Sequence, residues 1–316
     1  MSINVFADSI YNYDIANYAV PFFYACTGFF IAINSMSKND LIHSIKRKIQ
    51  KTTVMYIWCT VLYFPLTLYG WTTNGKNVAY NIFDFIRNFL FVGENYYSWT
   101  LWYLNGLIFA LLIVLWGIQK VDIRQLFSIS VFLYVIGLLL QTENTYQSAF
   151  PQFINTTIGV YFKIFHTTRN GLFRSFAFVM VGMVIGKQVQ QGKSQVNSFQ
   201  KAVTLIVYSL KIPLSVFGAR TIQNSVCQML DLPPIYVLFA LIIIQSSRFS
   251  KINNHTALFF RSLSGNIYYV HMYFVALCAL ALMSEETYNN FFSFFVVAVL
   301  STLLGASMIF IRKKSS

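Results

Sequence analysis

The sequence predicts an all-α fold, a polytopic bundle of transmembrane helices that forms one membrane-embedded domain over residues 1–316. Three observations support this prediction. Apolar residues make up 56% of the chain and charged residues only 10%, with a mean hydropathy of +0.56. The apolar residues form long runs, and the basic residues cluster between these runs. A soluble domain has about 25% charged residues, so this chain is too poor in charge to cover a water-exposed surface.

Nine apolar segments are expected to cross a bilayer, and the seventh of them is short and could be partly re-entrant. A hydrocarbon core of about 30 Å needs roughly 20 apolar residues in a helix. On that criterion the spans are 18–34, 52–70, 99–117, 124–141, 171–187, 200–218, 234–247, 264–283 and 291–311.

Residues 77–92 are too polar to be a span, but they are amphipathic. At helical spacing Asn81, Asp84 and Asn88 lie on one face, and apolar residues such as Ile82 and Phe85 lie on the other. This pattern predicts a helix lying in the membrane interface.

The basic residues predict the orientation of the spans. If alternate connections face the cytoplasm, 16 of the 23 Lys and Arg residues lie on that side, as the positive-inside rule requires. The C-terminus is then cytoplasmic and the N-terminus outside, in a multi-pass membrane protein. The net charge of +13 is therefore an orientation signal, and we expect no nucleic-acid partner.

The cysteines do not predict a metal site or a disulfide framework. Cys26, Cys59, Cys227 and Cys278 are isolated, without a C-x-x-C spacing. The sequence also lacks a nucleotide-binding loop and the Ser-x-x-Lys and Gly-x-Ser-x-Gly nucleophile motifs. We therefore expect no bound cofactor and no metal.

Several segments, in order, resemble the integral membrane acyltransferases of the acyltransferase-3 type. AVPFFYACTGFFIA (19–32), KRKIQKTTVMYIW (46–58), SWTLWYLNGLIFALLIV (98–114) and SLSGNIYYVHMYF (262–274) are similar to successive helices of that family. FHTTRNGLFRSFAFVMVGMVIGK (165–187) resembles the membrane domain of vancomycin-type serine racemases, which belongs to the same family. The resemblance implies ten spans, the first of which bears an Arg and a catalytic His. The chain has no counterpart of that helix, so we expect a truncated or a degenerate, inactive member.

His271 is the first candidate catalytic residue, and Tyr268 is a candidate substrate-binding residue three positions before it. Ionisable side chains within a membrane span are costly and usually mark a functional site. Imidazole titrates near neutral pH, which suits a general base. Packing against a neighbouring helix is the alternative role for His271.

A second candidate group precedes the span 171–187. His166 and Arg169 would share a helical face if that helix began early, and Asn170 would bind substrate beside them. A guanidinium binds an oxyanion or a carboxylate bidentately. Arg174, by contrast, is expected to extend to the lipid headgroups.

Two further groups are candidates for binding. Trp102 and Asn105 share a face of the span 99–117, where a ring and an amide suit a sugar or an acyl group. Arg47, Lys48 and Lys51 lie at the predicted cytoplasmic end of the span 52–70. They would hold either anionic lipid or the phosphates of an acyl-coenzyme A donor.

The resemblance implies an enzyme, an O-acyltransferase of the cell envelope. Its donor would be acetyl-CoA or another acyl-CoA, and its acceptor a surface glycan or a wall precursor. The first alternative is a transporter of a small polar substrate such as serine. The second is a non-catalytic membrane module.

Overall fold

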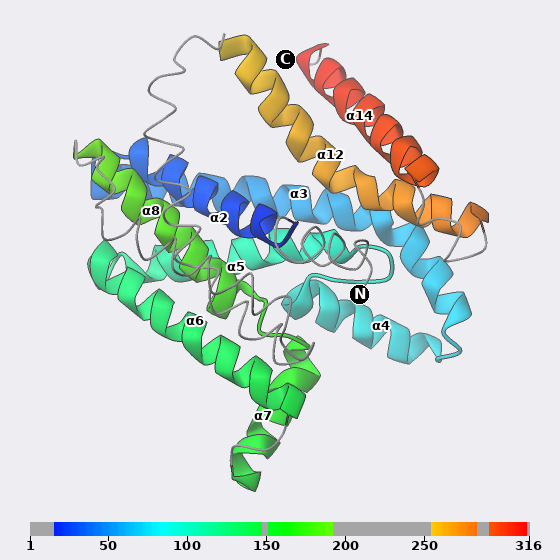
Figure 1. Cartoon of the computed structure of the whole chain (residues 1–316), viewed down its shortest axis with the longest axis horizontal. Coiled ribbons are helices and arrows are strands. Elements are labelled where there is room, and N and C mark those ends of the chain that lie inside the picture. Colours follow the sequence, from blue (N-terminus) through cyan, green and yellow to red (C-terminus); the bar gives the residue numbers. More distant parts are fainter. Residues whose placement is uncertain (1–15, 147–150, 192–253, 283–290, 315–316) are drawn as a thin grey trace, which may run out of the picture. The chain divides into compact units, whose positions relative to one another are not determined.

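The computed structural model describes residues 16–146, 151–191, 254–282 and 291–314, and every regular element in these ranges is helical (Figure 1). The predicted all-α class is therefore confirmed. The elements are α2 (Ala16–Ile33), α3 (Lys38–Thr73), α4 (Val78–Arg87), the π-helical turn η2 (Asn88–Val92), the 3₁₀ turn η3 (Trp99–Leu101), α5 (Trp102–Gly117), α6 (Ile123–Tyr146), α7 (Gln152–Phe165), the π-helical turn η4 (Gly171–Ser175), α8 (Phe176–Gln190), α12 (Asn254–Leu282) and α14 (Phe291–Lys314).

Five described helices are long and apolar enough to cross a membrane. They are Lys38–Thr73, Trp99–Gly117, Ile123–Gln141, Gly171–Gln190 and Phe292–Phe310, and Val20–Ile33 is a shorter apolar helix. The predicted span 264–283 falls almost entirely within α12. The predicted spans 200–218 and 234–247 lie outside the described residues, so the count of nine stays a prediction.

The chain divides into two compact units, each built from two stretches of sequence. Unit 1 comprises residues 1–53 and 105–248, and unit 2 comprises residues 54–104 and 249–316.

Unit 1 is organised around α8, which is buried along most of its length and packs against α2 and α6. Glycines let α2 and α8 approach closely. A Cβ added to Gly182 would lie 1.8 Å from the carbonyl oxygen of Ala25, and one added to Gly28 would lie 2.0 Å from that of Val179. Close approach of this kind strengthens packing where lipid supplies little hydrophobic drive between helices.

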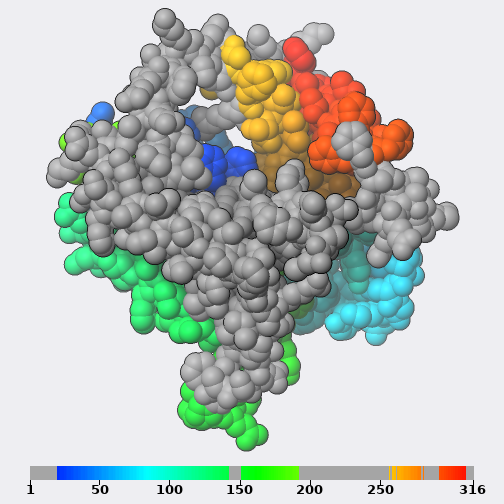
Figure 2. All heavy atoms as spheres, in the orientation of Figure 1, coloured from blue at the N-terminus to red at the C-terminus, as the bar shows by residue number. Residues whose placement is uncertain are grey.

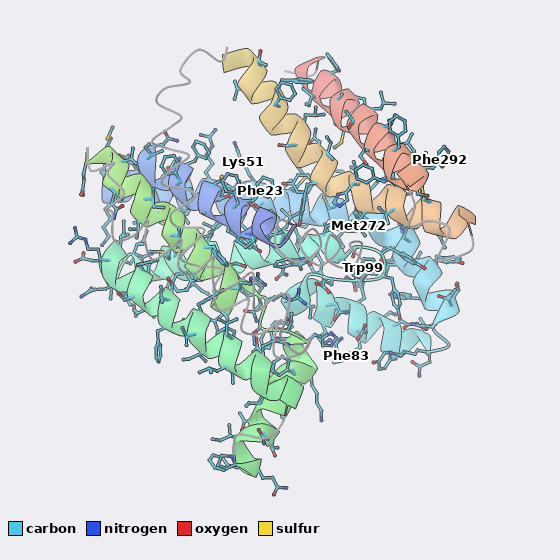
Figure 3. The ribbon with its side chains drawn as sticks, viewed as in Figure 1. Phe23, Lys51, Phe83, Trp99, Met272 and Phe292 are labelled. Atoms are coloured by element: carbon cyan, nitrogen blue, oxygen red, sulfur yellow. The ribbon has the colours of Figure 1, made fainter. Side chains whose placement is uncertain are left out.

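Unit 2 contains α12 and α14, which pack side by side (Figures 1 and 2). The side chain of Asn266 on α12 donates a hydrogen bond to the carbonyl oxygen of Gly305 on α14 at 2.9 Å. The apolar window Phe292–Phe310 is only 17% buried, and Phe292 itself is 72% exposed (Figure 3). So much exposed apolar surface on one helix indicates contact with lipid.

The amphipathic segment of unit 2 directs its polar face into the protein. Asn81 and Asn88 are buried, whereas Ile82 and Phe83 are exposed, Phe83 by 68% (Figure 3). The side chain of Asn74 donates hydrogen bonds to the amide oxygen of Asn81 at 2.8 Å and to the hydroxyl of Tyr96 at 2.7 Å. The predicted helix is present, and its outward face is the apolar one, as lipid contact requires.

The α2–α8 contact predicts a large difference between two glycine-to-alanine substitutions. Gly182→Ala places a methyl group against backbone atoms of α2, so we expect a loss of about 1–3 kcal/mol in the free energy of unfolding. Gly159→Ala is the matched control, because nothing lies within 4 Å of its added Cβ. Alanine there should be neutral or stabilising. Thermal unfolding midpoints in detergent measure both, and equal midpoints would contradict the close contact.

The orientation of α4 predicts its environment. A spin label at Phe83→Cys, with the native cysteines replaced, should be more accessible to dissolved oxygen than to a water-soluble nickel complex. A label at Asn77→Cys, the exposed cap that begins α4, is the comparison and should favour the nickel complex. Preferential nickel access at position 83 in lipid nanodiscs would show that this face is in water.

Candidate functional site

His271 lies half-buried in α12 of unit 2, and its hydrogen bonds define the state of its ring. Its Nδ1 is 2.8 Å from the carbonyl oxygen of Tyr268 and 3.2 Å from that of Ile267. A carbonyl oxygen only accepts, so Nδ1 carries the hydrogen. In the neutral ring Nε2 then holds the lone pair, which is the form that a general base needs.

Tyr268, the second predicted residue in unit 2, connects α12 to the turn η3. Its hydroxyl donates a hydrogen bond to the carbonyl oxygen of Thr100 at 3.2 Å. Its ring packs edge-on against Tyr103 with centroids 5.5 Å apart, and its centroid is 5.8 Å from that of His271. Trp102, the residue after the turn η3, begins α5 and is half-buried.

Two tyrosines that the sequence patterns did not single out contact the segment of α12 that holds Tyr268 and His271. Tyr63 on α3 is buried, and its hydroxyl donates to the carbonyl oxygen of Tyr269 at 2.8 Å. Tyr103 supplies the edge-on ring contact with Tyr268. Tyrosines are so frequent in this chain that neither position stood out, although a phenol in a span signals a buried hydrogen bond.

The predicted group before residue 171 belongs to unit 1, and its members share no helix. His166 ends α7 with a left-handed backbone at φ 58°, and the next helical turn, η4, begins only at Gly171. His166 and Arg169 are therefore on the link between two helical elements, where both are exposed. The early helix start that would align them on one face does not occur.

Asn170 is the cap of η4. Its side-chain oxygen accepts hydrogen bonds from the backbone N–H groups of Leu172 and Phe173, at 3.1 and 3.2 Å. Its amide nitrogen donates to the hydroxyl of Tyr161, which in turn donates to the carbonyl oxygen of Thr167. Burial raises the pKa of Tyr161 to about 12, against the opposing effect of the Asn170 bond, so this phenol keeps its proton at neutral pH.

Arg174 is buried, whereas the sequence predicts that its side chain extends to the lipid headgroups. This residue is only 9% exposed within η4, so the expected extension of its side chain to the lipid headgroups is wrong. π-Helical turns are often found at functional sites, and this one holds a cation inside unit 1. The sequence hid this arrangement, because an Arg at the end of a span normally reaches the interface.

The remaining predicted residues of unit 1 lie on α5 and α3. Asn105 is 5% exposed, so its amide is buried as expected. Arg47 and Lys51 are exposed on α3, and Lys48 is half-buried (Figure 3). Among the described residues, no three His, Cys, Asp or Glu side chains come together as a metal site.

The hydrogen bonds of Asn170 predict a graded response to substitution. Asn170→Ala removes the cap and should lower the free energy of unfolding by about 1 kcal/mol. Asn170→Asp keeps the accepting oxygen and should preserve most of the stability, although it loses the bond to Tyr161. Thermal unfolding midpoints distinguish the two variants, and an Asp variant as unstable as the Ala variant would refute capping as the main role.

Comparison with known proteins places these features in a family. A family model described as an acyltransferase domain matches residues 1–311. An amino-acid racemase of Enterococcus faecalis is 29% identical over 238 residues, covering 72% of this chain and 30% of the relative. A serine/alanine racemase of Enterococcus gallinarum is 25% identical over 323 aligned positions, covering 98% of this chain and 42% of the relative.

The chain thus spans less than half the length of these racemases. No solved structure matches it. The family model covers almost the whole sequence, including the helix with His271 and the turn with Asn170. The chain belongs to the acyltransferase domain family.

Proposed function

We propose that this chain is an acyltransferase of the bacterial plasma membrane. It transfers an acetyl or similar group from a cytoplasmic acyl-CoA to a hydroxyl of a cell-surface glycan or a wall precursor. The observation that carries the proposal is the family match over residues 1–311, within which α12 holds a histidine whose Nδ1 is bound to a backbone carbonyl oxygen.

The proposed chemistry is a hydroxyl attack on a thioester. Nε2 of His271 takes the hydroxyl proton as the oxygen attacks the carbonyl carbon. The C–O bond forms and the C–S bond breaks, and the proton passes to the departing thiolate, which leaves as the thiol of coenzyme A. Hydrogen-bonding of Nδ1 to the backbone of α12 supports this role, because it holds the ring in one tautomer.

The donor and acceptor groups have separate proposed sites. Arg47, Lys48 and Lys51 on α3 would attract the donor's phosphates, since they form a basic, largely exposed face. Tyr268 and Trp102 would contact the acceptor or the acyl group near His271.

Substitution of His271 tests the proposal. His271→Asn keeps an N–H group near the position of Nδ1 but removes the base, so we expect transfer to fall by about 100-fold or more. Tyr63→Phe is the matched control, because it removes only the hydroxyl bond to the carbonyl oxygen of Tyr269 on the same helix and should act mainly on stability. The measurement is transfer of labelled acetyl groups from acetyl-CoA to envelope material. Undiminished transfer by a folded Asn variant would exclude His271 as the base.

The racemase relatives favour a second candidate, transport of a serine-like substrate. In that case Arg169, which is exposed on the link before η4, would bind the substrate carboxylate. Uptake of labelled serine that is lost in Arg169→Gln, without acetylated product in either strain, would select the transporter and reject the transferase.

A further inference from the structure

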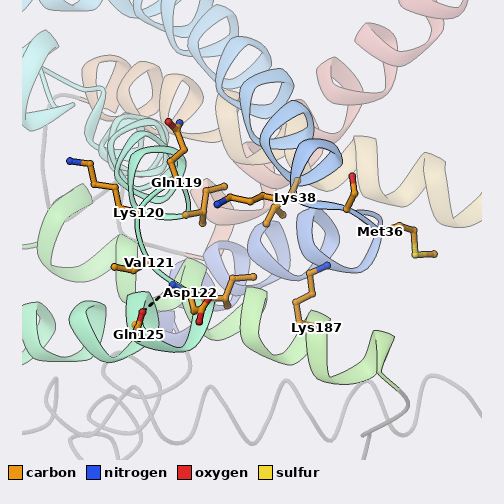
Figure 4. A pocket seen from close by; sticks show the side chains of 12 residues that line it. Met36, Lys38, Gln119, Lys120, Val121, Asp122, Gln125 and Lys187 are labelled. Atoms are coloured by element: carbon orange, nitrogen blue, oxygen red, sulfur yellow. Dashed lines mark hydrogen bonds between the residues drawn. The ribbon is translucent and has the colours of Figure 1, made fainter.

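One end of unit 1 contains a pocket of about 390 Å³ (Figure 4). Its walls come from the beginning of α3, the link between α5 and α6, and the end of α8. The charge pattern places all three parts on the side predicted to face the cytoplasm. Small-molecule sites commonly occupy about 300–1,000 Å³, so the pocket has room for a small ligand or for a lipid headgroup.

Three lysines and one carboxylate line this pocket, so its net charge is positive. Lys38 extends across the pocket from the first turn of α3 (Figure 4). The amine of Lys187 lies at the edge, where it donates to the carbonyl oxygen of Ser35 at 2.6 Å and to the side chain of Gln190 at 2.8 Å. An ammonium has three donors, and these bonds use two of them.

The side chain of the third lysine, Lys120, does not point into the pocket (Figure 4). The amine of Lys120 points away from the pocket in Figure 4 and lies 4.2 Å from the ring centre of Trp116. The carboxylate of Asp122 is exposed on the pocket wall, where it opposes the binding of an anion. Lys38 is thus the lysine best placed to contact a ligand, and Asp122 is the group that would weaken its binding.

Helix caps hold the rim of the pocket in place. The backbone N–H of Ser37 donates to the carboxylate of Asp40 at 3.0 Å, and the N–H of Asp40 donates to the hydroxyl of Ser37 at 3.1 Å. At the start of α6 the N–H of Asp122 donates to the side chain of Gln125 at 3.2 Å. Two helices therefore begin at this pocket, and the carboxylate of Asp40 offsets the partial positive charge at the start of α3.

We propose that this pocket binds a phosphate-bearing anion, with Lys38 as the direct ligand and Lys187 as a supporting cation. A phosphate group offers several accepting oxygens and a charge that lysine binds as a point charge. Its source is either the headgroup of an anionic phospholipid or a soluble phosphorylated molecule. The site is distinct from Arg47, Lys48 and Lys51, none of which lines the pocket, and it does not depend on acyl transfer.

Binding to the full chain in nanodiscs of phosphatidylcholine tests the site. The two probes are inorganic pyrophosphate and dioctanoyl phosphatidylglycerol, titrated separately and followed by calorimetry. Lys38→Met should weaken binding about tenfold, the worth of one charge-assisted hydrogen bond. Lys120→Met removes the same charge at the pocket edge and is the matched control, with an expected effect of about twofold or less.

Asp122→Asn is expected to change the affinity for the anion in the opposite direction. It removes the opposing carboxylate and keeps a residue type suited to the start of a helix, so affinity should rise. A gain of affinity cannot result from misfolding.

The two probes separate the two sources. Pyrophosphate binding that is weakened by Lys38→Met assigns a soluble phosphate, whereas phosphatidylglycerol binding with the same sensitivity and no pyrophosphate binding assigns a lipid headgroup. The proposal is overturned if neither probe binds, if Lys38→Met and Lys120→Met weaken binding equally, or if Asp122→Asn fails to raise affinity.

Discussion

Hydrocarbon offers no water to a polar group, so a polar side chain within a spanning helix must find its hydrogen-bond partner inside the protein. In the helices that the structure describes, the backbone of the same helix often accepts the hydrogen bond. The hydroxyl of Thr60 donates to the carbonyl oxygen of Tyr56 at 2.8 Å, and that of Thr302 donates to Ala298 at 2.7 Å. His271 follows the same rule through Nδ1. The requirement that makes this histidine compatible with a membrane also leaves its other nitrogen with the lone pair.

The same constraint explains why α4 is inverted relative to an amphipathic helix of a soluble protein. Asn81 and Asn88 face the interior, where Asn74, Arg87 and Asp84 supply partners, and the aromatic and aliphatic side chains face outward. The amide of Asn88 donates to Asp84 at 3.1 Å, and its oxygen accepts from Arg87 at 2.9 Å. Polar groups that would be exposed in water are here the contact surface of the helix.

Close packing around α8 connects the turn η4 at one end of the helix to the basic pocket at its other end. Glycines in α2 and α8 bring the two backbones together, so α8 is held firmly along its length. Its N-terminal end follows η4, where Asn170 caps the turn and Arg174 is buried. Its other end carries Lys187, whose amine is bonded to the end of α2 at Ser35. One helix therefore positions both the turn η4 and the basic pocket.

The sequence by itself determined the helical class, most span positions among the described residues and the existence of the amphipathic segment. These properties follow from local composition, because hydropathy and helical periodicity are read within one segment. It also marked His271, because an ionisable residue in an apolar run is conspicuous. Tertiary structure decided which face of α4 turns inward, that Asn170 caps η4, that Arg174 is buried, and that Lys38 and Lys187 line one pocket. The pocket brings together residues far apart in the chain, so no single segment carries the information that forms it. The Asn170 cap is local, but it depends on where η4 begins, which packing decides.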